Sequence, residues 1–174
     1  PRGRTGLSCR WVASVDYKSS KLKDAIGGVD HASTSAAAKV YCEHFPHRLL
    51  RAEGPFNYSA INNFAVENTD SPWLLFLNND TEVIESGWLT AMAEHVQRPE
   101  VGAVGARLIL RDETIQHAGV VLGVRGMVKH AFYGFPAESP GGCRQLQVTR
   151  NYSADTAASM MPRREVFLEV CGFD

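Results

Sequence analysis

The sequence lacks the features that would place it among membrane or strongly charged proteins. None of its segments approaches the roughly 18 consecutive apolar residues of a membrane-spanning helix. Its basic N-terminal segment is followed by no apolar run of signal-peptide length. The formal net charge of -1 provides no general attraction to a nucleic-acid backbone. We therefore expect a soluble protein that binds a small or neutral ligand and no nucleic acid.

Cysteine is scarce and scattered. The four cysteines are Cys9, Cys42, Cys143 and Cys171. They form no C-x-x-C pair and have no histidine at zinc-ligand spacing, so neither a zinc site nor a redox dithiol is expected. Disulfides stay open, but a reducing compartment fits better, and we expect a cytoplasmic protein. Arg2, Arg4 and Arg10 either contact an acidic membrane surface as a peripheral anchor or belong to a solvated terminus.

The composition is sufficient for one folded domain. The 174 residues are 44% hydrophobic and 21% charged, so we expect residues 1–174 to form a single domain. Strand-like apolar segments alternate with segments of helical period, which predicts a layered α/β sheet flanked by helices. We expect strands over residues 11–16, 48–51, 73–77, 101–110 and 114–123, helices over 33–45, 57–67 and 163–170, another helix capped by Ser86 and ending near Pro99, and loops over 27–30 and 136–142.

One predicted strand ends in a polar cluster. The apolar residues 74–77 run directly into Asn78, Asn79 and Asp80. In open α/β sheets, ligands bind at the carboxyl ends of strands. Asp80 is an oxygen donor suited to Mg²⁺ or Mn²⁺, which would neutralise a diphosphate, and the amides of Asn78 and Asn79 can hydrogen-bond a sugar. The alternative is that these residues only form a turn.

An ordered series of motifs resembles one enzyme family. The motifs are GPFNYSAINN at residues 54–63, LLFLNNDTEV at 74–83, GWL at 87–89, PEVGAVGA at 99–106, IQHAGVVLG at 115–123, MPRREVF at 161–167 and CGFD at 171–174. Together, over about residues 54–174, they are similar to the family 2 glycosyltransferases of the GT-A fold, and within that family to the rhamnosyltransferase-like branch of bacterial surface-polysaccharide enzymes.

The resemblance implies a nucleotide-diphospho-sugar transferase fold, a layered mixed sheet flanked by helices. It implies inverting transfer of a sugar from a UDP-type or dTDP-type donor to a saccharide or lipid-linked saccharide acceptor, at the inner face of the membrane. Asp80 would coordinate Mg²⁺ or Mn²⁺ on the diphosphate, Asn78 would face the ribose, and Asn63 would lie close to the nucleotide. Val15-Asp16 resembles the family's strand end whose Asp contacts the nucleobase; a turn-forming role for Asp16 is the alternative.

The resemblance also implies that part of the family's domain is missing from this sequence. The family's proposed catalytic base lies in a Glu-Asp pair that would follow Asp174, and its opening strand needs more residues before Asp16 than are present. We therefore expect a truncated domain with no catalytic base within residues 1–174. The alternative function is a non-catalytic nucleotide-sugar-binding or structural module. A nucleotide-dependent oxidoreductase or a sugar nucleotidyltransferase is disfavoured because no Gly-rich phosphate loop such as G-x-G-x-x-G is present.

His117 is the histidine whose position most suggests a catalytic base or a ligand. It lies in a strand-like segment, but a lone histidine is more often a packed structural residue, and we interpret it so. We interpret Asp155 as an ordinary loop carboxylate, with proximity to the sugar as the alternative. We expect Met160 and Met161 to pack in the core, and the other histidines to be structural or on the surface.

Overall fold

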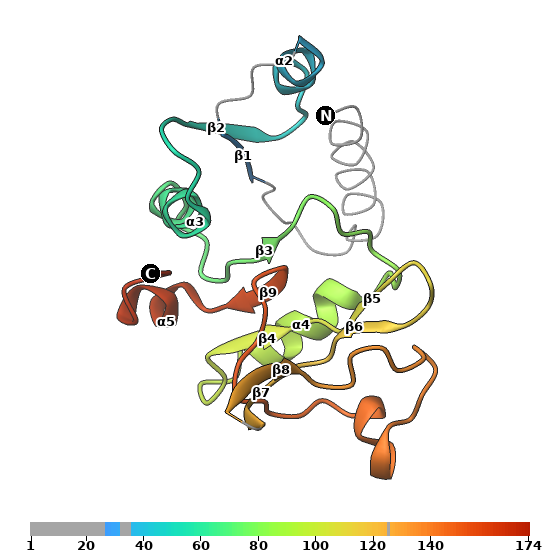
Figure 1. Cartoon of the computed structure of the whole chain (residues 1–174). Coiled ribbons are helices and arrows are strands. Elements are labelled where there is room, and N and C mark those ends of the chain that lie inside the picture. The colour runs from blue at the N-terminus through green and yellow to red at the C-terminus, as the bar shows by residue number, and fades with distance from the viewer. Residues whose placement is uncertain (1–26, 32–35, 125) are drawn as a thin grey trace.

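The computed structural model of the chain describes residues 27–31, 36–124 and 126–174 (Figure 1). Within these ranges strands and helices alternate, as predicted. In chain order the elements are β1 (Gly27–His31), α2 (Ala36–Glu43), β2 (Arg48–Ala52), α3 (Tyr58–Glu67), β3 (Phe76–Leu77), α4 (Trp88–Val96), β4 (Ala103–Gly105), β5 (Leu108–Ile109), β6 (Ile115–His117), β7 (Val120–Val124), β8 (Met127–His130), the 3-10 helix η1 (Gly142–Gln147), β9 (Ser159–Pro162) and α5 (Arg164–Glu169). The strand predicted over residues 11–16 lies outside the described residues.

Strands β1 and β2 form a parallel pair. Val29 of β1 is in register with Leu50 of β2, and the chain between them, which includes α2, supplies the crossover that parallel neighbours need. The prediction of a loop over residues 27–30 is therefore wrong. The two glycines conceal the alternation of polar and apolar residues that would indicate a strand. Gly28 has a packing role, since a Cβ there would lie 2.9 Å from a ring carbon of Phe45, and its absence lets the ring approach the backbone.

The central sheet is built around β9. This strand pairs antiparallel with β3 on one side and with β4 on the other, and Met160 lies opposite both Phe76 and Gly105. Because both neighbours run antiparallel to β9, β3 and β4 run parallel to each other. The sequence did not predict β9, since Ser159–Pro162 shows no alternation of polar and apolar residues and ends in proline.

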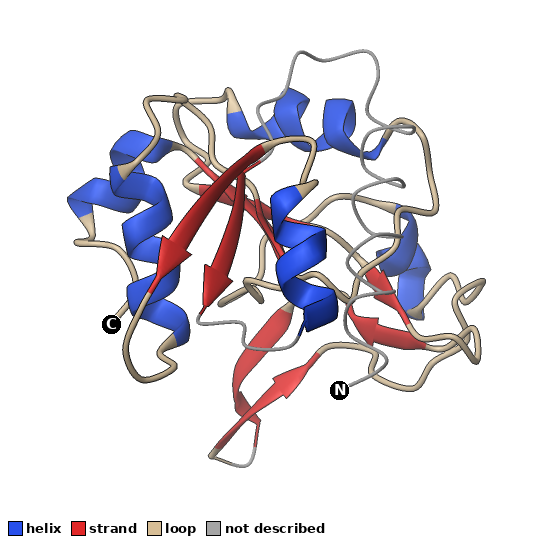
Figure 2. Ribbon diagram, turned by 90° about the horizontal axis from the view of Figure 1, so that it is seen from above, coloured by secondary structure: helices blue, strands red, loops and turns tan. Residues whose placement is uncertain are grey.

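Two apolar clusters cover the two faces of the central sheet. The first consists of Val66, Leu74, Phe76 and Phe167. The second consists of Leu89, Met92, Val96 and Met161. Adjacent residues of β9 divide between the faces, as the two-residue period of a strand requires: Met160 packs against the first cluster and Met161 belongs to the second. The predicted packing of both methionines is thus confirmed. Helices α3 and α5 contribute to the first cluster and α4 to the second (Figures 1 and 2).

Two helix ends are set by local hydrogen bonds. Helix α3 begins after Asn57, whose Oδ1 accepts a hydrogen bond from the backbone N–H of Ala60 at 3.0 Å. Helix α5 is followed by Gly172 at φ +79°, and the N–H of Gly172 donates to the carbonyl of Phe167 at 2.9 Å. The predicted end of this helix before Gly172 is therefore confirmed.

The start of α4 differs from its prediction. The N-cap residue is Gly87, and no side chain caps the helix, so the prediction of Ser86 as the cap is wrong. The N–H of Trp88 instead donates to the carbonyl of Glu85 at 3.3 Å, which forms a turn around Ser86 and Gly87. That turn satisfies one of the N–H groups that a capping side chain would otherwise bind.

Each of the two strands predicted over residues 101–110 and 114–123 divides into two. The N–H of Ala106 donates to the carbonyl of Ser159 at 3.1 Å, so the chain follows β9 beyond β4. Gly119 adopts φ +107°, a conformation that favours glycine, and separates β6 from β7. As a result β6 pairs with β5, whereas β7 pairs with β8.

In the described parts of the chain, no helix has both the length and the apolar character needed to cross a bilayer. The expectation that residues 1–174 form a single domain stays a prediction.

Replacing Phe76 with alanine is expected to lower the free energy of unfolding by about 3–5 kcal/mol, because it leaves a cavity in the first cluster. Phe76 is 6% exposed, and its ring centroid lies 4.9 Å from that of Phe173 and 5.2 Å from that of Phe167. Urea denaturation measures the loss. The matched control is Phe56→Ala: Phe56 is 73% exposed, and a change within about 0.5 kcal/mol is expected. Equal losses in the two variants would contradict this description of the core.

Candidate functional site

The predicted Asn78–Asp80 cluster forms a turn directly after β3. The backbone N–H of Asn78 donates to the carbonyl of Ala158 at 3.0 Å and so extends the pairing of β3 with β9. The carbonyl of Asn78 then accepts hydrogen bonds from Thr81, from its N–H at 3.2 Å and its hydroxyl at 2.6 Å. Asn79 and Asp80 are exposed within this turn. The turn-forming role is confirmed, and the ligand-binding roles of these residues stay predictions.

Asn63 lies on α3 with its amide bound to the C-terminal segment. Its Nδ2 donates to the carbonyl of Phe173 at 2.9 Å, and its Oδ1 accepts from the N–H of Phe173 at 3.0 Å. Both polar ends of the side chain therefore bind one backbone unit. Gly172 also lies close to this amide, since a Cβ there would lie 2.6 Å from Asn63 Oδ1. A nucleotide contact by Asn63 would have to compete with these bonds, and that predicted role stays a prediction.

The predicted nucleobase residue, Asp16, lies outside the described residues. A second Val-Asp pair, Val29-Asp30, lies in β1 near its carboxyl end, where Asp30 is 8% exposed. Asp30 Oδ2 lies 4.0 Å from a guanidinium nitrogen of Arg51, which follows in the neighbouring strand β2. Sequence reasoning missed Asp30, although it shares with Asp16 a preceding valine and nearby small polar residues.

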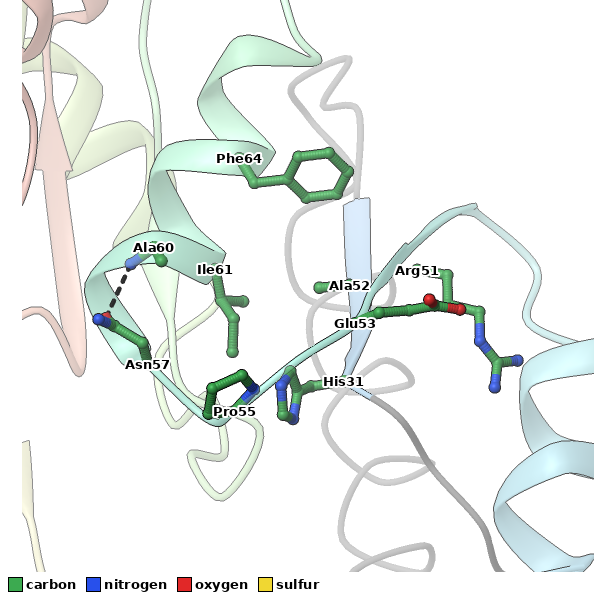
Figure 3. A pocket seen from close by; sticks show the side chains of 9 residues that line it. All are labelled: His31, Arg51, Ala52, Glu53, Pro55, Asn57, Ala60, Ile61 and Phe64. Carbon is green, nitrogen blue, oxygen red and sulfur yellow. Dashed lines mark hydrogen bonds between the residues drawn. The ribbon is translucent and has the colours of Figure 1, made fainter.

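Two cavities lie beside the β1–β2 pair. The first, of ≈ 280 Å³, lies between the carboxyl ends of these strands and the start of α3 (Figure 3). Its lining includes His31, Arg51, Asn57 and Ile61. The second, of ≈ 370 Å³, is lined by Asp30, Lys39, Cys42, Glu43 and Arg51. Neither of these two cavities is lined by Asn63 or by the Asn78–Asp80 turn.

Burial raises the pKa of the Cys42 thiol, and the negative charge of Asp30 raises it further. Because the thiolate is the nucleophilic form of cysteine, these surroundings make Cys42 less reactive. The second cavity therefore offers binding groups rather than an activated nucleophile.

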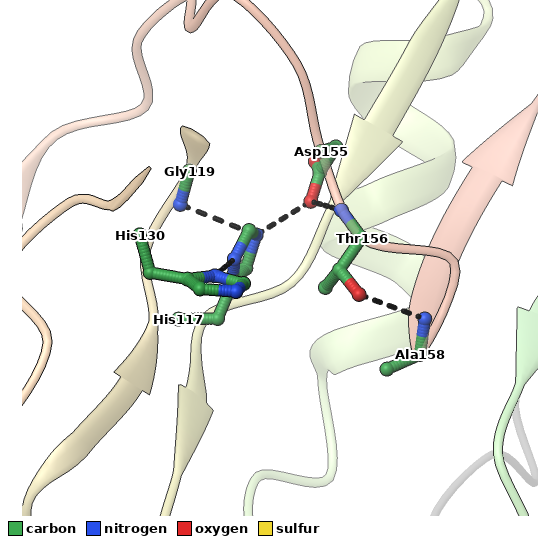
Figure 4. A network of polar contacts seen from close by, with 6 residues as sticks. All are labelled: His117, Gly119, His130, Asp155, Thr156 and Ala158. Atoms are coloured by element: carbon green, nitrogen blue, oxygen red, sulfur yellow. Dashed lines mark hydrogen bonds and ion pairs between the residues drawn. The ribbon is translucent and has the colours of Figure 1, made fainter. Parts of the chain in front are cut away.

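His117 forms the centre of a polar network (Figure 4). Its side chain is buried, with the residue 1% exposed. Its Nδ1 lies 2.7 Å from Nδ1 of His130 on β8, and its Nε2 lies 2.6 Å from Oδ1 of Asp155. The interpretation of His117 as a packed, hydrogen-bonded residue is confirmed. Asp155 is not an ordinary loop carboxylate, because it is paired with a buried imidazole; that contact joins residues far apart in the sequence, and spacing gave no signal for it.

The segment that precedes β9, residues 155–158, connects this network to the Asn78 turn. The hydroxyl of Tyr58 at the start of α3 donates to the carbonyl of Ala157 at 3.2 Å. Burial raises the pKa of Tyr58, so the hydroxyl keeps the proton that this bond requires. The next residue, Ala158, accepts the N–H of Asn78. The turn that carries Asp80 is thus fixed to residues 155–158, which are fixed in turn to α3 and β6.

The described residues contain no group of three or more His, Cys, Asp or Glu side chains placed to hold a metal ion. Asp80 offers one exposed carboxylate. Mg²⁺ in nucleotide sites is commonly held by one or two carboxylates, while substrate phosphates and waters complete its coordination. Asp80 therefore fits a divalent ion that arrives with a diphosphate.

Comparison with known proteins identifies related sequences. Residues 20–166 match the family described as Glycosyl transferase family 2. The chain is 46% identical over 128 residues to the O-antigen biosynthesis protein RfbC of Myxococcus xanthus, and 45% identical over 127 residues to the uncharacterized protein y4gI of Sinorhizobium fredii (strain NBRC 101917 / NGR234). These matches cover 72% and 73% of this chain but only 10% and 14% of the two relatives.

A solved structure has a similar fold. It is described as the mannosyltransferase PcManGT from Pyrobaculum calidifontis in complex with GDP-Man and Mn2+. The TM-score is 0.62 at 16% sequence identity, and the match covers 99% of this chain and 45% of that chain. At this identity the likeness establishes the fold alone.

Asn63→Ala is expected to lower the free energy of unfolding by about 1–3 kcal/mol, because it leaves the N–H and carbonyl of Phe173 without their partner. Chemical denaturation measures this. Asn62→Ala is the control on the same helix, since the Asn62 side chain bonds only within α3, where its Nδ2 donates to the carbonyl of Tyr58 at 2.8 Å and its amide also interacts with the Tyr58 hydroxyl. A change within about 0.5 kcal/mol is expected for the control. If Asn63→Ala is as stable as Asn62→Ala, the amide contact is not holding the C-terminal segment.

Proposed function

Because this chain belongs to glycosyl transferase family 2 and has the GT-A fold, we propose that it transfers a sugar from a nucleotide-diphosphate sugar to a saccharide or lipid-linked saccharide acceptor. The observation that carries this proposal is the position of Asp80. Its exposed carboxylate lies in a turn at the end of a buried strand, and the turn is anchored by the bond from Asn78 to Ala158. The carboxyl ends of strands are where ligands bind in open α/β sheets.

The donor proposed is a UDP-type or dTDP-type sugar bound with Mg²⁺ or Mn²⁺. Asp80 would hold the cation, and the amides of Asn78 and Asn79 would hydrogen-bond the ribose and the sugar. The structurally similar mannosyltransferase is described with GDP-Man and Mn2+, which supports a nucleotide sugar together with a divalent ion.

The base-binding part of the site is proposed to include Asp30. This carboxylate lies near the carboxyl end of β1 and lines the ≈ 370 Å³ cavity together with Arg51. It has the strand-end position that the resemblance assigned to Asp16. A guanidinium nitrogen of Arg51 lies 4.0 Å from Asp30 Oδ2 and places a positive charge beside it.

The reaction proposed is an inverting single displacement, in which an acceptor hydroxyl attacks the anomeric carbon and the nucleoside diphosphate leaves. When bound, a divalent cation would stabilise the negative charge of that leaving group. The proposed task of the residues described here is to position the donor. The Asn78–Asp80 turn would bind the polar groups of the donor, and hydrogen bonds between Asn78 and both Ala158 and Thr81 fix the turn. We propose that a carboxylate takes the proton of the acceptor hydroxyl.

The biological setting proposed is the synthesis of bacterial surface polysaccharide, in the rhamnosyltransferase-like branch of the family, in the cytoplasm at the inner face of the membrane. The similarity to an O-antigen biosynthesis protein supports the polysaccharide product. The chain covers only 10% of that relative. The proposed saccharide acceptor therefore rests on membership of the family and not on the relative's name.

Asp80→Ala is expected to weaken Mn²⁺-dependent binding of UDP or dTDP by at least about tenfold, or ~1.4 kcal/mol, because it removes the carboxylate ligand of the ion. Isothermal titration calorimetry with and without Mn²⁺ measures this. Asp70→Ala is the matched control: Asp70 is an exposed carboxylate that precedes β3, so its loss changes the net charge equally.

Unchanged Mn²⁺-dependent affinity in Asp80→Ala would refute the metal role of Asp80. Binding without transfer in the full-length protein would instead favour the alternative, a nucleotide-sugar-binding module.

A further inference from the structure

The His130–His117–Asp155 network lies outside the residues assigned to the donor site. Its members come from β8, from β6 and from the segment that precedes β9, so it ties three parts of the chain together (Figure 4). Nε2 of His117 lies 2.6 Å from Oδ1 of Asp155 and accepts the N–H of Gly119 at 3.2 Å, while its Nδ1 lies 2.7 Å from Nδ1 of His130. Both ring nitrogens of the buried imidazole are therefore engaged by polar groups.

The carboxylate of Asp155 is held on several sides. Besides His117, Oδ1 accepts the N–H of Thr156 at 2.7 Å. Its other oxygen lies against Gly105 of β4, where a Cβ would overlap the carboxylate. The absence of a side chain at Gly105 is therefore what allows the carboxylate to reach the imidazole. A short side chain at this position would displace the carboxylate and break its contact with His117.

The network continues to the Asn78 turn through covalent and hydrogen bonds. Asp155 and Ala158 are ends of one short segment, and the carbonyl of Ala158 accepts the N–H of Asn78. The hydroxyl of Thr156 accepts the N–H of Ala158 at 3.4 Å, which stiffens the segment between them (Figure 4). A displacement of Asp155 therefore acts on the residue that begins the turn carrying Asp80.

We propose that His117 is a positioning residue of the donor site: oriented by His130, it holds Asp155 and thereby keeps the segment 155–158 and the Asn78–Asp80 turn in the geometry that binds the cation and the diphosphate. This inference rests on the function proposed above for Asp80. His117 needs no contact with substrate for this role. The coupling is local, because hydrogen bonds and one short peptide segment join His117 to Asn78.

The test compares Mn²⁺-dependent binding of UDP and dTDP by calorimetry in the full-length protein. His117→Leu removes both imidazole nitrogens, and Gly105→Ala displaces the Asp155 carboxylate without changing either histidine. Both variants are expected to bind the nucleotide about tenfold more weakly than the wild type. His117→Gln keeps a polar amide in place of the imidazole that contacts Asp155, and its affinity is expected to return to within about threefold of the wild type.

The free energy of unfolding, measured on the same variants, separates positioning from general destabilisation. The control is Val96→Ala, because Val96 is 0% exposed in the second cluster and lies outside the network. It should lose stability while its nucleotide affinity stays that of the wild type. An affinity loss in Val96→Ala as large as that in His117→Leu would overturn the inference, since any core defect would then produce it.

The outcomes distinguish this inference from the proposed function. A wild-type protein that binds neither nucleotide with Mn²⁺ refutes the proposed donor site. A wild type that binds, together with an Asp80→Ala variant that does not, supports that site. If His117→Leu and Gly105→Ala then bind as tightly as the wild type, the positioning role is refuted alone. Should His117→Leu fail to fold, Gly105→Ala and His117→Gln decide the question.

Discussion

The pairing of β9 with both β3 and β4 is the interaction on which the rest of the structure depends. It places β9, which comes late in the chain, between β3 and β4, the two strands that α4 connects in sequence. The alternation of Met160 and Met161 then supplies side chains to both apolar clusters. One extension of the same pairing, from Asn78 to Ala158, fixes the turn of the candidate site. Core and site are therefore set by one strand, and a change of register there would alter both.

Several polar side chains in this molecule form hydrogen bonds that fix the position of backbone segments. Asn63 binds the N–H and carbonyl of Phe173, and Tyr58 binds the carbonyl of Ala157. Asp155 is held by His117 and itself accepts a backbone N–H from Thr156. The exposed residues of the Asn78–Asp80 turn are thus supported by an inner layer of hydrogen bonds. This arrangement is what a binding site needs if a small number of exposed groups is to keep a defined geometry.

The sequence predicted the parts of the fold that local patterns determine. Helices α3, α4 and α5 each bury one face, and their helical period could be read directly. The turn after β3 followed from its polar residues. Strands β1 and β9 and the pairing of His117 with Asp155 were missed, because each depends on a partner distant in the sequence. Asp30 was missed because its strand begins with two glycines, which conceal the alternation.

The position of β9 in the chain has a consequence for synthesis on the ribosome. Strands β3 and β4 emerge first, and neither has its neighbour until residues 159–162 have been translated. During that interval the edges of both strands and the apolar faces of α3 and α4 are uncovered. Such surfaces can bind other chains before folding is complete. Slow release of this segment, or an early stop before β9, would therefore make the nascent protein a client of chaperones.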